Sequence, residues 1–153
     1  MATEIERKFL LAGNALPPFE GGTLYEQGYL SENVERTVRI RIAGEKAYIT
    51  IKGKTTGYAR LEFEYEIPAG DARELMKLCE HAPISKTRYV VYYASHRWEV
   101  DVFHGQNEGL VLAELELTSE NEPFDMPPWI GEEVTRDFRY ANAYLAAHPY
   151  RSW

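Results

Sequence analysis

The chain has 153 residues, of which 44% are hydrophobic and 27% charged, as in an ordinary folded protein rather than a disordered one. Its formal net charge of −7 argues against a large nucleic-acid-binding surface, which needs net positive charge. The single cysteine, Cys79, excludes an internal disulfide and a cysteine-based zinc site, and no apolar run reaches membrane-spanning length. We therefore expect one domain over residues 1–153, located in the cytoplasm, with neither membrane nor nucleic acid as a partner.

Most of the chain alternates polar and apolar residues with period two, which predicts strands that have two different faces. Turn signals such as the loop from Gly53 to Gly57 and the connection Ala94-Ser95-His96 separate these segments. Strands are predicted at residues 3–11, 24–30, 35–43, 46–53, 59–68, 86–94, 97–104 and 110–118. Eight antiparallel strands are compatible with a closed barrel.

Two helices are also predicted. The first begins with Asp71 as its N-cap and carries an apolar stripe from Leu75 to Cys79. The second covers residues 139–147 and is stopped by Pro149. A β-rich chain with a few flanking helices is an α+β protein dominated by an antiparallel sheet.

The charged residues of each predicted strand share one face, and whole faces carry one sign. The acidic set consists of Glu4, Glu6, Glu62, Glu64, Glu114 and Glu116. The basic set consists of Lys8, Arg39, Arg41, Lys52, Lys86 and Arg88. A solvated sheet face is the simplest explanation for any single strand, but a solvated face usually mixes the two signs because like charges repel. Segregated faces that turn inward would need ligands to balance them.

A complex of a divalent cation with a triphosphate would balance both sets. Carboxylate oxygens are the ligands that Mg²⁺ or Mn²⁺ prefers, and arginine binds phosphate oxygens in bidentate geometry. Other chemistries fit less well, because the sequence has no Gly-rich phosphate loop and its histidines show no metal-ligand spacing. Asp101 is left open between a lining residue and a partner of a nearby arginine, and Glu66 is left open as a solvated residue at the end of the acidic row.

These residues form an ordered series that resembles the CYTH domain, the family of triphosphate tunnel metalloenzymes, and in particular its short bacterial members. The resemblance begins with the pattern Glu4-Ile5-Glu6-Arg7-Lys8 and extends along essentially the whole chain. It includes Val38-Arg39-Ile40-Arg41, Thr50-Ile51-Lys52, Glu62-Phe63-Glu64, Lys86-Thr87-Arg88, Asp101-Val102-Phe103 and Glu114-Leu115-Glu116.

The resemblance implies an eight-stranded antiparallel tunnel whose lumen binds a triphosphate and divalent cations. By position, the basic set would bind phosphates, and the acidic set would bind one or two metal ions or position water. The resemblance also implies catalytic roles for Lys8 and Tyr29, together with Glu4 and Glu6. A packed strand aromatic is an equally good interpretation of Tyr29.

The leading functional hypothesis is metal-dependent hydrolysis of inorganic triphosphate to pyrophosphate and phosphate. One alternative is a class IV adenylyl cyclase or a thiamine or nucleoside triphosphatase. A second alternative is a non-catalytic polyphosphate-binding module, which would not need the acidic set. Two helices leave much of an eight-stranded barrel uncovered, so an exposed apolar patch could also serve as a homodimer interface.

Overall fold

The computed structural model describes residues 3–13 and 19–153. Nine strands are present: β1 (Thr3–Leu11), β2 (Thr23–Ser31), β3 (Arg36–Ala43), β4 (Lys46–Gly53), β5 (Ala59–Ile67), β6 (Ile84–Tyr93), β7 (His96–Phe103), β8 (Val111–Glu116) and β9 (Ile130–Glu133). The helices are α1 (Ala69–Met76) and α2 (Asn142–Ala147), with short 3₁₀ turns at Gly105–Asn107, Phe138–Tyr140 and Tyr150–Ser152.

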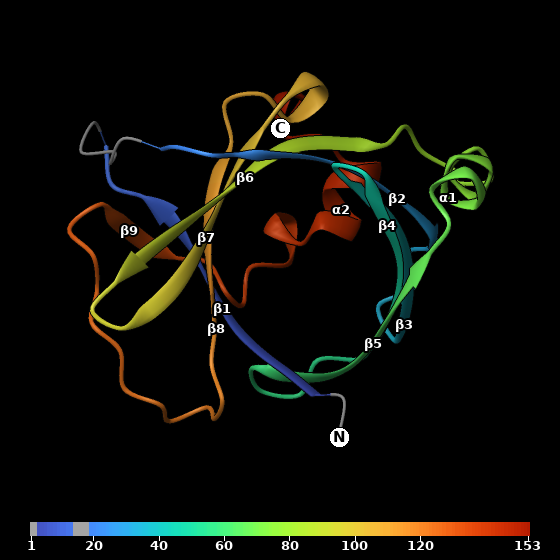
Figure 1. Ribbon diagram of the computed structural model, residues 1–153. Helices are drawn as coiled ribbons and strands as arrows, with labels where there is room; N and C mark the ends of the chain where they lie inside the picture. The colour runs from blue at the N-terminus through green and yellow to red at the C-terminus, as the bar shows by residue number, and fades with distance from the viewer. Residues whose placement is uncertain (1–2, 14–18) are drawn as a thin grey trace.

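Eight strands close into an antiparallel barrel in the order β5-β4-β3-β2-β6-β7-β8-β1. The barrel closes where the beginning of β1 pairs with the beginning of β5, with Glu4 opposite Arg60. The ninth strand, β9, pairs with the end of β1 outside the ring, with Phe9 opposite Glu133. Figure 1 looks along this ring, with α1 on its outside. The predicted α+β fold with an eight-stranded antiparallel barrel is confirmed.

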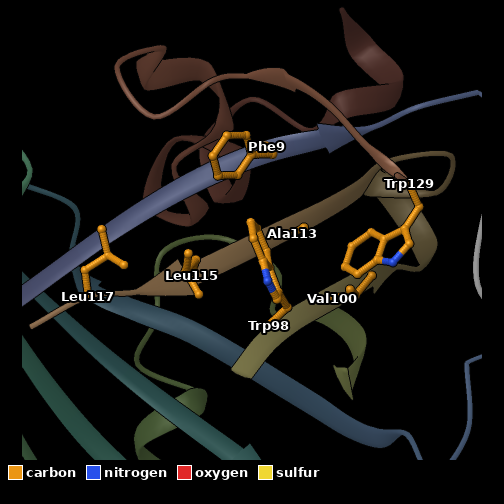
Figure 2. Close-up of a cluster of buried hydrophobic side chains, with 7 residues drawn as sticks. All are labelled: Phe9, Trp98, Val100, Ala113, Leu115, Leu117 and Trp129. Carbon is orange, nitrogen blue, oxygen red and sulfur yellow. The ribbon is translucent and has the colours of Figure 1, made fainter. Parts of the chain in front are cut away.

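Two of the three hydrophobic cores lie on the outward strand faces, whereas the third, around Phe103 and Leu112, lies on inward strand positions at one end of the barrel. The first core packs the outer faces of β1, β7 and β8 against the segment after β8; Figure 2 shows its members, which are Phe9, Trp98, Val100, Ala113, Leu115, Leu117 and Trp129. The Trp98 indole lies 5.6 Å from the Phe9 ring and 5.9 Å from the Trp129 ring, measured between centroids. Burial of these large side chains stabilises the wall without filling the lumen.

Two further cores hold the helices. Helix α1 lies on β3 and β4, where Ala72 is buried with Ile40 and Ala47. Helix α2 contributes Leu145 to a cluster with Ile84 and Phe103. Neither helix is long and apolar enough to cross a membrane, and the same is true of every helix in the described part of the chain.

Some outward apolar side chains have no such cover. Leu61, Phe63 and Tyr65 on β5 and Ile51 on β4 are exposed. Phe63 lies directly opposite Ile51 in the sheet, so these side chains form one patch next to the area covered by α1. The homodimer interface expected from the sequence stays a prediction.

The helix boundaries differ from those predicted. Helix α1 begins at Ala69 and its N-cap is Pro68, so the prediction of Asp71 as N-cap is wrong; Asp71 lies in the first turn instead. Proline sets a fixed φ that suits a helix start without any side-chain cap. The predicted helix at 139–147 is interrupted at Ala141, which is extended, so only Asn142–Ala147 is α-helical.

Candidate active site

The barrel encloses a lumen of about 670 Å³. Every residue that the sequence predicts for the site lines it, namely Glu4, Glu6, Lys8, Tyr29, Arg39, Arg41, Lys52, Glu62, Glu64, Lys86, Arg88, Glu114 and Glu116. Period-two alternation explains this arrangement, because alternate residues of a barrel strand point inward. Glu66 is exposed and does not line the lumen.

A basic region occupies the part of the lumen formed by β3 and β6. Arg41 donates from Nε to Oε1 of Gln27 at 2.9 Å, and its guanidinium lies 4.8 Å from the Tyr25 ring centroid. Burial and the neighbouring Arg39 and Arg88 lower the pKa of Arg41 to about 10. Arg41 has no carboxylate partner among the described residues, and it therefore offers its charge to a ligand.

Asp101 anchors the two β6 cations in this region. Arg88 donates to its carboxylate from Nε at 2.7 Å and from Nη2 at 2.8 Å, and Lys86 Nζ lies 2.7 Å from Oδ2. Burial alone would raise the pKa of Asp101, but Lys86 and Arg88 hold it well below its usual range. Burial, reinforced by Arg88 and Arg41, lowers the pKa of Lys86 to about 7 although Asp101 opposes the shift. The sequence left Asp101 open between a lining residue and a partner of a nearby arginine, and these contacts agree with the second interpretation.

An acidic region lies across the lumen on β1 and β8. Glu6 is directly opposite Glu116 in the sheet, and Lys8 is opposite Glu114, with its Nζ 3.6 Å from Glu114 Oε1. Burial, then the charges of Glu114 and Glu4, raise the pKa of Glu6 to about 7. Burial also raises the pKa of Glu116, with Glu4 and Glu6 adding to the effect. In the described part of the chain, neither the Glu6 nor the Glu116 side chain has an ion-pair partner.

The remaining predicted acids are paired with bases. Lys52 Nζ lies 2.9 Å from Glu4 and 3.3 Å from Glu62. Arg39 lies 3.3 Å from Glu64, whose Oε2 also accepts a 2.8 Å hydrogen bond from the Thr50 hydroxyl. These carboxylates are less available to a cation than those of Glu6 and Glu116, because opposite charges already balance them.

Among the lumen carboxylates of the described structure, Glu6 and Glu116 are therefore the ones left without a base, and with the paired Glu114 beside them they are the candidate ligands of a divalent cation. Two ionised carboxylates placed opposite each other repel, and burial together with Glu114 and Glu4 further disfavours the charged form of Glu6. Glu114 differs, because Lys8 and Arg88 lower its pKa to about 2 against the effect of burial, so it is ionised. Oxygen donors of this kind suit a hard cation.

Lys8 and Tyr29 lie on different walls of the lumen. Lys8 Nζ donates to the backbone oxygen of Tyr140 at 3.1 Å. Tyr29 is buried among Ile84, Phe103 and their neighbours and also lines the lumen, so it shows features of both interpretations made from the sequence.

The C-terminal segment supplies lumen residues that the strand pattern could not reveal. Asn142 Oδ1 accepts from Lys86 Nζ at 3.0 Å and from Gln27 Nε2 at 2.8 Å. Arg136 and Phe138 also line the lumen. Other lining residues could have been found, because Arg60 shares the strand face of Glu62 and Tyr25 that of Tyr29.

In the described structure, the three side chains whose ligand atoms already lie close enough to share a cation are outside the lumen. The ligand atoms of Glu32, Glu80 and His81 lie within 4.8 Å of one another. His81 Nδ1 is hydrogen-bonded to Glu32, so these two side chains satisfy each other and need no cation.

The CYTH domain model matches residues 2–150 of the chain. The chain belongs to the CYTH domain family. A protein of Acetivibrio thermocellus named inorganic triphosphatase is 48% identical over 154 residues, covering 100% of this chain and 99% of its own length. An inorganic triphosphatase of Nitrosomonas europaea is 38% identical over 152 residues, covering 94% of this chain and 97% of its own.

Solved structures agree with this assignment. A crystal structure of an inorganic triphosphatase aligns with a TM-score of 0.68 at 37% identity, covering 95% of both chains. A chain from Hippeastrum aligns with a TM-score of 0.59 at 18% identity, covering 76% of this chain and 80% of its own, which supports the fold alone.

Proposed function

We propose that this CYTH domain protein hydrolyses inorganic triphosphate to pyrophosphate and phosphate with the help of Mg²⁺ or Mn²⁺. The observation that carries the proposal is the division of one lumen into a basic region on β3 and β6 and an acidic region on β1 and β8. A triphosphate with its cation would balance both regions at once. The name inorganic triphosphatase, which two relatives along nearly the full length carry, supports the same activity.

Lys8, Arg39, Arg41, Lys52, Lys86 and Arg88 would bind the phosphate oxygens. Arg41 is the leading candidate of the set, because among the described residues no carboxylate is paired with it and a phosphate would not have to displace one. Arg39 supports the assignment in another way, since its buried Nε has no hydrogen-bond partner in the described structure. A phosphate oxygen would satisfy that donor in a charge-assisted hydrogen bond.

Glu6, Glu114 and Glu116 would hold the cation, with Glu4, Glu62 and Glu64 as further carboxylates nearby. When bound, the cation supplies charge neutralisation at the transferring phosphoryl group and lowers the pKa of coordinated water. A carboxylate of this chain that does not hold the cation would then accept the proton of the attacking water.

Lys8 and Tyr29 would act on the substrate from opposite walls. The Lys8 ammonium would donate hydrogen bonds to the departing pyrophosphate, and the Tyr29 hydroxyl would help to orient the terminal phosphate. Both side chains line the lumen, which gives them access to a bound triphosphate. Catalysis would then rest on positioning and charge stabilisation, as is general for phosphoryl transfer.

Phosphate release from tripolyphosphate, measured colorimetrically with Mg²⁺ and then with Mn²⁺, tests the proposal. The wild-type protein should release phosphate, and the Glu114→Ala variant should not. Equal release from the two proteins would refute it. A parallel assay with ATP and thiamine triphosphate, together with detection of cyclic AMP, identifies the substrate among the triphosphates.

A further inference from the structure

Two guanidinium groups flank one tyrosine ring beside the lumen. The Arg136 guanidinium lies 4.8 Å from the centroid of the Tyr58 ring, and the Arg7 guanidinium lies 5.1 Å from the same centroid. We call these three residues the Tyr58 stack. Cations at such distances from an aromatic ring are held by its quadrupole.

The two arginines of the Tyr58 stack differ in their remaining contacts. Arg7 donates two hydrogen bonds to Glu133, at 2.8 Å from Nε and 2.6 Å from Nη2, so its charge is balanced. Arg136 is exposed, lines the lumen and has no ion-pair partner among the residues that the structure describes. A stacked guanidinium keeps its N–H donors free in the plane of the group, where they can bind an anion.

The backbone at Tyr58 is itself held by hydrogen bonds. The Tyr58 backbone N–H donates to Glu120 Oε1 at 2.8 Å, and paired backbone hydrogen bonds between Thr56 and Ala59, at 2.7 and 3.0 Å, tighten the loop before β5. The same loop carries Lys54, another exposed lumen residue without an ion-pair partner in the described structure. The loop therefore places two cations without an ion-pair partner in the described structure at the lumen. Lys54 belongs to the loop itself, and Arg136 contacts the loop residue Tyr58.

Most other cationic side chains of the lumen have an ion-pair partner. Lys8, Arg39, Lys52, Lys86, Arg88, Arg60 and Arg97 each lie within 4 Å of a carboxylate. Among the described residues, Arg41 is the half-buried exception, and Lys54 and Arg136 are the exposed ones. Exposed unbalanced cations on a lumen wall act on an anion before it reaches the buried site.

We infer that Arg136, held by Tyr58, is a substrate-capture residue that binds a linear phosphate anion as it enters the lumen, with Lys54 beside it. This inference rests on the proposed triphosphatase function. Arg136 acts in substrate association and leaves the chemical step to the residues described above. Removal of the Arg136 side chain should raise KM and leave kcat unchanged. This result is expected for a contact that stabilises the bound substrate and the transition state equally.

Steady-state kinetics with tripolyphosphate at low salt test the inference in the full-length protein. The Arg136→Gln variant should show a KM about fivefold higher than wild type, with unchanged kcat, because the lost contact is partly exposed to solvent. The difference should shrink as salt is added, since salt screens exposed charges. Arg136→Lys should recover part of the loss.

Arg73→Gln is the matched control. It removes the same charge from the exposed face of α1, far in the fold from the lumen lining. Tyr58→Leu should reproduce the KM increase of Arg136→Gln by removing the ring, whereas Tyr58→Phe should not, because phenylalanine keeps it. Equal KM values for Arg136→Gln and Arg73→Gln, or a fall in kcat without a change in KM, would overturn the inference.

A binding measurement separates this inference from the proposed function. Isothermal titration of tripolyphosphate into metal-free protein requires no turnover. Arg136→Gln should bind about fivefold more weakly than Arg73→Gln at low salt. Loss of that difference would overturn the capture role even in an active enzyme. A wild-type protein that releases no phosphate would refute the triphosphatase proposal instead.

Discussion

Glu6 and Glu116 lie directly opposite each other on β1 and β8, and neither is paired with a base among the described residues. Two like charges in this position destabilise the sheet whenever both are ionised. The cost is tolerated if the protein normally binds a cation there, and this connects the stability of the barrel to pH and to metal.

The first prediction concerns the pH dependence of stability without metal. The pKa of Glu6 rises from 4.5 in the unfolded chain to about 7 in the fold, so the folded state binds its proton more tightly. Unfolding free energy should therefore fall as pH rises from 4.5 to 7, by about 2 kcal/mol from this residue. Urea unfolding of wild type and Glu6→Gln at several pH values measures the effect. A variant that follows the wild-type pH profile would contradict the prediction.

The second prediction concerns metal binding at pH 8. Mg²⁺ or Mn²⁺ should raise the melting temperature of the wild-type protein by about 5 °C at saturating concentration, because only the folded state presents the site. Glu116→Gln should lose most of this increase. Glu66→Gln, which changes an exposed acid outside the lumen, should keep it. Equal shifts in the two variants would remove Glu116 from the metal site.

The third prediction concerns Arg41. Replacing it with glutamine should lower kcat/KM for tripolyphosphate about 100-fold, the usual loss for a donor that stabilises transition-state charge. Arg36→Gln on the same strand is the control, because Arg36 is exposed and outside the lumen lining. Phosphate release at low substrate concentration measures both. If the two variants have the same activity, Arg41 does not bind the substrate.

The fourth prediction concerns Asp101. The Asp101→Asn change leaves Lys86 and Arg88 without their shared buried counter-charge. Unfolding free energy should fall by about 3 kcal/mol, since removing one partner of a buried ion pair strands the other. Urea unfolding at pH 7 provides the measurement, with Asp71→Asn as an exposed control in α1. An unchanged transition midpoint would show that other groups balance both cations.

The lumen residues could be predicted from the sequence because successive residues of a strand point to opposite faces of the sheet. The inward positions of Arg39 and Arg41, for example, follow from their spacing alone once the segment is a strand. The pairing of charges could not be predicted in this way. That Lys52 would contact Glu4, from a strand 48 residues earlier in the chain, depends on barrel closure between β1 and β5.

The lumen residues of the C-terminal segment could not be predicted from the sequence for a different reason. Arg136 reaches the lumen from irregular structure and Asn142 from the first position of α2, so no strand alternation relates them to a face. The short strand β9 was missed because Ile130–Glu133 is only four residues long, too short for alternation to be distinguished from chance.

Placing the core around Trp98 outside the barrel separates two demands on the sequence, stability of the wall and binding in the lumen. In an ordinary domain, a new residue next to the active site disturbs the packing that stabilises the fold. Here Trp98 and its neighbours stabilise the wall from the outside, and the charged residues on the same strands line the lumen instead. The charged residues on these strands can therefore change, and with them the preferred anion, with little effect on the packing of this core.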